Sequence, residues 1–301
     1  MTHLIAVQGV KAQPVKGKLM LTTVSLLPSI RIGELVRGAF DPSIALVSRS
    51  LIVQPGQSEQ DVQQQTADQM RESQVAAAAV ALKYLGYKVD IKYTGIRIIG
   101  IQESAPAAAV LRPGDLISTV DGQPVRRPPE LVSAIHRHSI GSSVKLRVVR
   151  GANSFTATVK LIPSPRNARD PAIGVIIDSV PQVKLPLAIS INAQGIGGPS
   201  AGLMFAVGIV DLLNRSDLTR GRRIAGTGEI ELDGTVGPVG GIRQKMEGAR
   251  RAGAKLFLAP LPELREACQA GAGLTVIGVS NLSEAVRALQ GAKLPANRRC
   301  K

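Results

Sequence analysis

The hydrophobic positions change their period several times along the chain, and each change predicts a different element. Over residues 58–85 apolar side chains recur at helical spacing, and Gly86 is a natural stop, so a long helix is expected. Runs rich in β-branched and apolar residues predict strands at 18–26, 96–101, 144–150, 155–161, 173–177, 187–191, 224–232, 256–259 and 275–279. Other periodic runs predict helices over 129–138, 203–213, 241–252, 263–270 and 282–289. Strands and helices alternate from residue 172 onward, which predicts an α/β domain there.

The composition is that of a globular protein. The chain has 301 residues, of which 44% are hydrophobic and 20% charged, so about two domains are expected. A net charge of +15 is compatible with nucleic acid as a partner. The positive charge is dispersed, however, and with 2% aromatic residues and no Trp a base-stacking platform is not expected. We therefore expect no nucleic acid, and the rival interpretation predicts DNA binding that weakens steeply with salt.

Two cysteines are too few for a disulfide framework or a zinc site, and neither a metal nor a cofactor is expected. Cys268 lies in a predicted helix and is interpreted as a small buried residue, whereas Cys300 lies in a basic tail. This leaves the redox compartment open. No run reaches the roughly 18 to 20 apolar residues that span a bilayer, and the first residues do not have the pattern of a signal peptide.

The chain is organised around a glycine-rich stretch at 195–202, Gly-Ile-Gly-Gly-Pro-Ser-Ala-Gly. It stands between a predicted strand and a nearly all-apolar helix, which places Ser200 at the first turn of a buried helix. Helix starts carry unpaired N–H groups and the positive end of the dipole, so a serine there is suited to nucleophilic attack with donors for an oxyanion. The simpler interpretation is a serine that only caps the helix.

The rest of the sequence restricts the chemistry open to Ser200. No histidine occurs after His138, which excludes the residue order of an α/β-hydrolase triad. The P-loop and dinucleotide patterns are both incomplete, so nucleotide binding is not expected. A serine nucleophile without histidine can use a lysine base, provided that burial keeps the amine neutral. Lys245, in an apolar and glycine-rich neighbourhood, is the candidate.

Three ordered motifs resemble the proteolytic domain of Lon, over about residues 173–289. They are Gly-Pro-Ser-Ala-Gly, then Thr-Gly-Glu-Ile-x-Leu-x-Gly-x-Val-x-Pro-Val-Gly-Gly-Ile-x-x-Lys, then Ala-Gly-Ala-Lys-x-Phe-Leu-Ala-Pro. The resemblance implies a dyad in which Ser200 is the nucleophile and Lys245 the general base. It also implies that Thr227 hydrogen-bonds the lysine amine. The sequence departs from the family before the serine, where Gly197-Gly198 replaces Asp-Gly.

A second stretch resembles a PDZ domain of the bacterial protease-associated type, over residues 93–163. The resemblance is carried by Ser-x-Pro-Ala, Leu-Arg-Pro-Gly-Asp-Leu-Ile and the hairpin Val-Asp-Gly-x-x-Val. PDZ domains bind peptide C-termini by strand addition, with backbone N–H groups holding the carboxylate. By resemblance, the loop that does so is made of Tyr93, Thr94, Gly95 and Ile96.

The expected fold is therefore multidomain, of the α+β or α/β class, with a Lon-type proteolytic domain and a PDZ-like β-rich module. The expected parts are an N-terminal strand and long helix that are candidates to complete the protease domain, a PDZ-like domain, a proline-rich linker, the proteolytic domain and a basic tail. Their bounds are 1–92, 93–163, 164–171, 172–291 and 292–301.

A PDZ-like module before a Lon-type domain, with no ATPase, resembles the bacterial Lon-like proteases that carry PDZ domains. The resemblance implies an ATP-independent serine endopeptidase that acts on proteins or peptides and forms a homo-oligomeric ring, with a hexamer as the expected size. It also implies a membrane-associated, extracytoplasmic protein, although a soluble form is the alternative because this chain has no transmembrane segment or signal peptide. The alternative function is a protein-binding adaptor whose protease fold is silent or autoinhibited.

Overall fold

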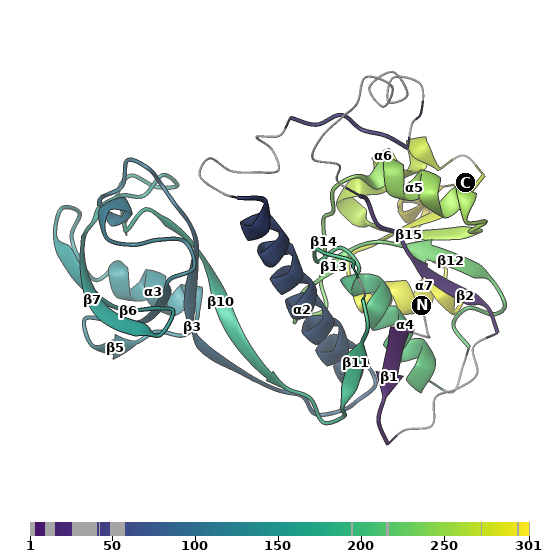
Figure 1. The fold of residues 1–301 in the computed structure, drawn as a ribbon, viewed down its shortest axis with the longest axis horizontal. Helices are drawn as coiled ribbons and strands as arrows, with labels where there is room; N and C mark the ends of the chain where they lie inside the picture. Colours follow the sequence, from purple (N-terminus) through teal and green to yellow (C-terminus); the bar gives the residue numbers. More distant parts are fainter. Residues whose placement is uncertain are drawn as a thin grey trace. The chain divides into compact units, whose positions relative to one another are not determined.

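The computed structural model describes residues 4–9, 16–25, 41, 43–48, 58–193, 195–214, 217–271, 273–293 and 295–300. The chain divides into two compact units (Figure 1). The first unit combines Met1–Val89 with Leu185–Lys301, and the second is Asp90–Lys184. The second unit is therefore inserted into the first, and the N-terminal strand and long helix belong with the Lon-like part of the chain.

The first unit is built on a sheet with the strand order β17-β16-β15-β12-β2. In chain order these strands are β2 (Lys18–Leu21), β12 (Arg223–Gly226), β15 (Leu256–Pro260), β16 (Thr275–Val279) and β17 (Arg299–Cys300). The first four run parallel, and β17 is antiparallel to β16. Leu19 pairs with Ile224, so the N-terminal segment supplies an edge strand of this sheet.

Helices cover both faces of this sheet because successive strand residues point to opposite sides. In β15, Leu256 and Leu258 join one apolar core while Phe257 and Ala259 join the other. The first core is shared with α2 (Glu59–Tyr84), α4 (Gly202–Leu213) and α7 (Leu282–Leu289). The second is shared with α5 (Ile242–Arg251) and α6 (Leu264–Ala270), which lie on the other face (Figure 1).

The remaining elements of this unit are short. They are the antiparallel pairs β1 (Ile5–Val7) with β11 (Ile189–Ile191) and β13 (Glu229–Ile230) with β14 (Val236–Gly237), and the 3-10 turns η4 (Leu261–Glu263) and η5 (Ala296–Arg298). Helix α4 is buried from Gly202 to Leu212 because it packs against α2, α7 and the sheet, and its side chains are nearly all apolar. Among the helices of the described ranges, none combines the length and the apolar character needed to cross a membrane.

The C-terminal residues form an edge strand rather than a basic tail. Strand β17 pairs with β16, and a disulfide joins Cys300 to Cys268 of α6. Sequence reasoning missed this pair because the cysteines are 32 residues apart and meet only when β17 joins the sheet. Disulfides form and persist in oxidising compartments, a point on which the sequence alone left the chain unassigned.

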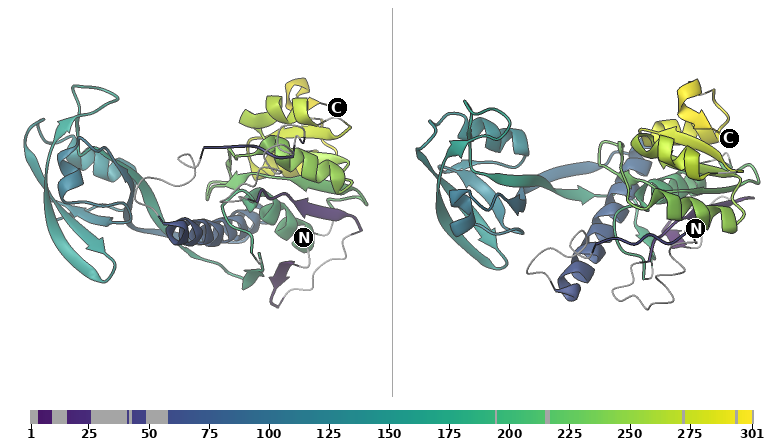
Figure 2. Two further views of the ribbon diagram at one scale, coloured as in Figure 1. Left: turned by 45° about the horizontal axis from the view of Figure 1, so that its top comes forward. Right: turned by 90° about the horizontal axis from the view of Figure 1, so that it is seen from above.

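The second unit is a β-rich module with the strand order β10-β3-β4-β6-β7. The paired strands β3 and β10 form a long ribbon (Figure 2). The elements, in chain order, are β3 (Asp90–Ile101), η3 (Pro106–Ala109), β4 (Leu116–Val120), β5 (Gln123–Pro124), α3 (Pro128–Ile135), β6 (Ser143–Arg150), β7 (Asn153–Lys160), β8 (Ile162–Pro163), β9 (Pro171–Ala172) and β10 (Val175–Lys184).

The segment at 164–171, expected to link two domains, instead joins two paired strands inside the second unit. Ile162 of β8 pairs with Ala172 of β9, and β10 then continues along β3. The unit boundary therefore falls after Lys184 rather than before Ala172. A local β pattern does not say which sheet a strand joins, and here β10 joins the module that precedes it in sequence.

One buried carboxyl in the first unit has little to neutralise it. Asp211 of α4 is 1% exposed, and its Oδ1 accepts a hydrogen bond from the Leu218 backbone N–H at 2.7 Å. Its Oδ2 has no partner among the described residues. Burial raises the pKa of Asp211 to about 6, so the folded protein binds this proton more tightly than the unfolded chain does.

We expect Asp211→Asn to stabilise the protein at pH 8 but not at pH 4. The unfolded carboxyl ionises near pH 3.9, about 2 units below the folded one, so ionisation costs the wild type stability as the pH rises from about 4 to 6. That pKa shift corresponds to about 3 kcal/mol of stability. The substitution leaves an amide N–H without a partner, which costs part of this amount, so we expect the free energy of unfolding to rise by about 1 to 2 kcal/mol. Urea unfolding at both pH values measures it, and an equal gain at pH 4 would contradict the assignment.

Candidate active site

The three residues implied by the Lon resemblance approach one another at the carboxyl end of β12. Thr227 follows β12 directly, Ser200 precedes α4 on one face of the sheet, and Lys245 lies in α5 on the other face (Figure 1). The carboxyl ends of parallel strands are the usual location of sites in open α/β sheets. The fold thus brings the two candidate side chains, Ser200 and Lys245, from opposite layers.

The turn that carries Ser200 ends just before the helix. Gly198 has a φ of +79°, and the N–H of Gly202 donates to the carbonyl of Pro199 at 3.1 Å, which closes a tight turn. Helix α4 begins at Gly202, so Ser200 precedes the first turn rather than lying within it. The serine is therefore held by a loop and does not act as the helix cap.

The backbone of Ser200 is fixed by the segment after β12. Its carbonyl accepts hydrogen bonds from the Gly228 N–H at 2.8 Å and from Thr227 Oγ1 at 3.0 Å. In return, the Leu203 N–H in the first turn of α4 donates to the Gly228 carbonyl at 3.0 Å. These contacts satisfy a free N–H of the helix start and hold the serine turn against Thr227.

Lys245 is buried because of its place on the apolar stripe of α5. Ile242, Lys245, Met246 and Ala249 share the buried face at helical spacing, and Lys245 is only 4% exposed. Its Nζ donates a hydrogen bond to Thr227 Oγ1 at 3.0 Å. Burial lowers the pKa of Lys245 to about 8, against the opposing effect of the nearby Glu229 carboxylate.

Glu229 is the acidic group next to this amine, and sequence reasoning did not assign it a role. Burial raises the pKa of Glu229, the neighbouring Glu231 raises it further, and Lys245 opposes both effects. The interaction between Glu229 and Lys245 favours the charged form of each group. Glu229 therefore limits how far burial lowers the pKa of the amine.

The direction of the hydrogen bonds decides what this arrangement can do. The Thr227 hydroxyl proton is committed to the Ser200 carbonyl, so Thr227 Oγ1 accepts from Lys245. A neutral amine in this position keeps its lone pair free. Among the hydrogen bonds of the described residues, none involves the Ser200 hydroxyl, so Lys245 and Ser200 are joined through Thr227 and not directly. Catalytic hydrogen bonds are often long in unliganded enzymes.

The four residues expected to form a peptide-binding loop lie inside strand β3. Tyr93, Gly95 and Ile96 pair with β10, and Thr94 Oγ1 donates to the Val180 carbonyl of that strand. Ile96 also pairs with Ile117 of β4, on the other side of β3. Backbone groups already used by a sheet do not hold a ligand carboxylate, so the structure has a strand where the sequence predicted a loop.

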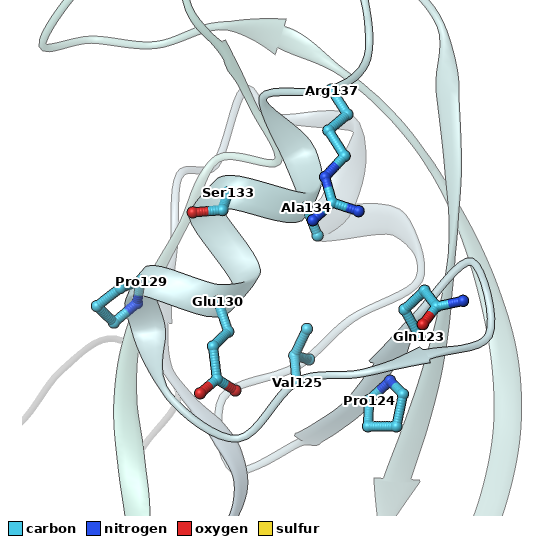
Figure 3. A pocket seen from close by; sticks show the side chains of 8 residues that line it. All are labelled: Gln123, Pro124, Val125, Pro129, Glu130, Ser133, Ala134 and Arg137. Atoms are coloured by element: carbon cyan, nitrogen blue, oxygen red, sulfur yellow. The ribbon is translucent and has the colours of Figure 1, made fainter.

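A cavity of about 350 Å³ lies between α3 and β5 of the second unit (Figure 3). Its one acidic lining residue, Glu130, accepts from the Arg126 backbone N–H at 2.8 Å and from Arg127 Nε at 2.9 Å. The carboxylate is therefore engaged, and no predicted site residue lines this cavity. Across the described ranges, no group of three or more His, Cys, Asp or Glu side chains could hold a metal ion.

We expect Glu229→Gln to lower the pKa of Lys245 further, because the substitution removes the negative charge that stabilises the ammonium form. The titration is measured by NMR on protein labelled at the lysine ε-carbon, with Lys245→Arg assigning the signal. The wild-type midpoint should lie at about 8. Glu247→Gln on the same helix is the control, since that carboxylate is bound by Arg250 and Arg251. An unchanged or higher midpoint in Glu229→Gln would refute this electrostatic account.

Comparisons with known proteins agree with both resemblances. Residues 179–288 match the family model of the Lon protease (S16) C-terminal proteolytic domain, and residues 83–161 match that of the PDZ domain. Lon protease 2 of Bacillus subtilis is 34% identical over 99 residues, which are 32% of this chain and 18% of that protein. Lon protease 2 of Herpetosiphon aurantiacus is 36% identical over 107 residues, which are 34% of this chain and 13% of that protein.

Among solved structures, the PDZ domain of the SdrC-like protein from Listeria monocytogenes is 29% identical, with a TM-score of 0.27, and the match covers 29% of this chain and 92% of that one. The chain spans less than a fifth of the length of the two Lon proteases it matches. Its two matched segments are similar, in chain order, to a PDZ domain and to a Lon-type proteolytic domain.

Proposed function

We propose that this protein is a serine endopeptidase that hydrolyses protein substrates with a dyad of Ser200 and Lys245. The observation that carries the proposal is the buried Lys245 amine, hydrogen-bonded to Thr227, which in turn bonds to the carbonyl of Ser200. A buried lysine with a lowered pKa, next to a serine at a glycine-rich turn, is the arrangement that a lysine base needs. The match to a Lon proteolytic domain supports the same chemistry.

In the first step the Ser200 hydroxyl oxygen attacks the carbonyl carbon of the scissile peptide bond, and its proton moves to the neutral Lys245 amine. Thr227 holds that amine by accepting a hydrogen bond from one of its N–H groups. Its own hydroxyl hydrogen is donated to the Ser200 carbonyl, so Thr227 does not compete for the lone pair of the amine. Its role is to orient the base, and Thr227 does not itself transfer a proton.

The negative charge on the former carbonyl oxygen needs backbone donors. Within the described residues, the N–H groups of Ser200 and Ala201 have no recorded hydrogen-bond acceptor, and both lie beside the nucleophile at the start of α4. They are our candidates for the oxyanion site. When the carbon–nitrogen bond breaks, Lys245 gives its proton to the leaving amine. It then accepts a proton from the water that hydrolyses the acyl-enzyme ester.

We further propose that the PDZ-like unit binds a peptide C-terminus along β10. This strand lies at the edge of its sheet and contacts α3, the arrangement that strand addition needs. Before β10 the chain turns at Gly174, which has a φ of +73° and where a Cβ would lie 2.4 Å from that of Ala105. The N–H groups of Ile173 and Gly174 have no recorded acceptor within the described residues, so they are available to a carboxylate.

A second candidate function is a protein-binding adaptor whose protease fold is silent or autoinhibited. One observation favours it: in the described residues no hydrogen bond joins the Ser200 hydroxyl to Lys245. Fluorophosphonates separate the two functions because they label only an activated serine. Labelling of Ser200 would support the peptidase, and a lack of labelling would support the adaptor. A homo-oligomeric ring and membrane association remain predictions from the resemblance.

We expect Ser200→Ala and Lys245→Ala to abolish cleavage of an unfolded protein such as casein, assayed without ATP. Wild-type kcat/KM should rise about tenfold from pH 7 to pH 9, because only the neutral amine accepts the proton and the Lys245 pKa is about 8. Thr227→Val, which removes the hydroxyl that orients the amine, should lower kcat by about 10² to 10⁴-fold.

The control for this assay is Lys255→Ala, which changes a lysine outside the site, ten residues beyond Lys245. Circular dichroism and thermal unfolding establish that each variant is folded. Cleavage at the wild-type rate by a folded Ser200→Ala or Lys245→Ala protein would rule out the dyad.

For the PDZ-like unit we expect binding to need a free carboxylate. The probes are fluorescein-labelled decapeptides with an apolar last residue, each made with a free C-terminus and as the amide. The free forms should bind at least about tenfold tighter, because the amide lacks the charge that the backbone N–H groups hold. Val132→Glu, at an exposed position of α3, should weaken binding if the peptide lies between α3 and β10. Equal affinity of acid and amide would argue against carboxylate capture.

A further inference from the structure

We infer that Ser73 of α2 is a positioning residue for the nucleophile, holding the turn before Ser200 in its reactive place. This inference rests on the proposed peptidase function and goes beyond the dyad. Its basis is a hydrogen bond from Ser73 Oγ to the carbonyl of Pro199 at 2.9 Å. The two residues are 126 positions apart, so only the folded first unit brings them together.

Helix α2 holds the serine turn at two neighbouring points. Besides the contact from Ser73, the carbonyl of Thr66 accepts a hydrogen bond from the Gly198 N–H at 2.9 Å. On the other side, Thr227 Oγ1 and the Gly228 N–H hold the carbonyl of Ser200. The backbone from Gly198 to Ser200 is thus fixed from both sides by hydrogen bonds, while the serine side chain takes part in none of those recorded for the described residues.

The position of Ser73 is unusual for a helical serine. It is 5% exposed and lies on the apolar stripe of α2 between Met70 and Ala77, which are 4% and 0% exposed. Serine in a helix interior usually bonds back to a carbonyl of its own helix, and alanine is the better helix former. Here the hydroxyl proton goes to Pro199, outside the helix. The sequence shows only a serine on the apolar stripe of a predicted helix, and its hydrogen-bond partner becomes apparent in the fold.

Gly197, which stands where the Lon family has an aspartate, also lies close to α2. A Cβ at position 197 would lie 3.2 Å from both Cβ and Oγ1 of Thr66, which is tighter than most real contacts of this kind. An aspartate would therefore push the turn away from α2. At Gly202 a Cβ would lie 2.6 Å from Ser73 Oγ, so the helix also approaches closely on the other side of the nucleophile.

We expect Ser73→Ala to lower kcat by about 10 to 100-fold while KM stays within about twofold. Ser73 contacts the backbone of the turn, so its loss displaces the attacking oxygen without removing a substrate contact. The rate at which a fluorophosphonate labels Ser200 should fall by a similar factor. The matched control is Val80→Ala, a buried position of the same helix that shares its core and lies away from the turn. It should lose stability but keep kcat.

The outcomes separate this inference from the proposed function. Full activity in Ser200→Ala would overturn the peptidase, whereas an inactive Ser200→Ala together with wild-type kcat in Ser73→Ala would overturn only the role of Ser73. An equal loss of kcat in Val80→Ala would also overturn it, since the effect would then come from stability alone.

Should Ser73→Ala fail to fold, a second pair of variants tests the packing of the same turn against α2, at Gly197 and Thr66. Gly197→Ala should lower kcat because the new methyl group meets Thr66. Thr66→Gly removes the side chain it meets, so the double variant should recover part of the loss. This recovery would be a coupling between residues in contact, and its absence would contradict the role of α2.

Discussion

The site depends on a lysine amine buried next to a single oriented hydroxyl. An ammonium at this depth loses hydration that one hydrogen bond does not replace, so burial weakens proton binding and the pKa of Lys245 falls to about 8. Thr227 accepts a hydrogen bond from one N–H of that amine and donates its own hydroxyl hydrogen bond to the backbone carbonyl of Ser200. The physical constraint is therefore the placement of Thr227, since one hydroxyl fixes both the base and the backbone of the nucleophile.

That placement follows from the sheet. Thr227 continues β12 and donates its N–H to the Leu258 carbonyl of β15, so its position is as rigid as the strand pair. Helices α4 and α5 reach it from opposite faces, and each brings one reactive residue. Close packing around it needs small residues: at Gly226, a Cβ would lie 2.6 Å from Met204 Sδ. The glycines around the site are thus explained by packing as much as by turns.

The sequence carried the local parts of this arrangement. The spacing of Ile242, Met246 and Ala249 predicted the buried face of α5, and Lys245 lies on it. The strands β15 and β16 and the helix α7 lie where their apolar runs predicted them. Such local patterns do not predict contacts between segments that are distant in the sequence. The disulfide of Cys300 and the contact of Ser73 with Pro199 both join residues that are neighbours only in the fold.

The error in the second unit has the same origin, and it changes where a ligand is expected. The apolar run at 173–177 predicts a strand but not its sheet, and from the sequence it is expected in the Lon-type domain because it follows the proline-rich segment at 164–171. The register of β10 with β3 runs from Val175 opposite Ile101 to Lys184 opposite Asp90. The first and last residues of the inserted unit, Asp90 and Lys184, are therefore paired with each other. Because β10 is the edge strand, our proposal for peptide binding lies on β10 and not on residues 93–96 of β3.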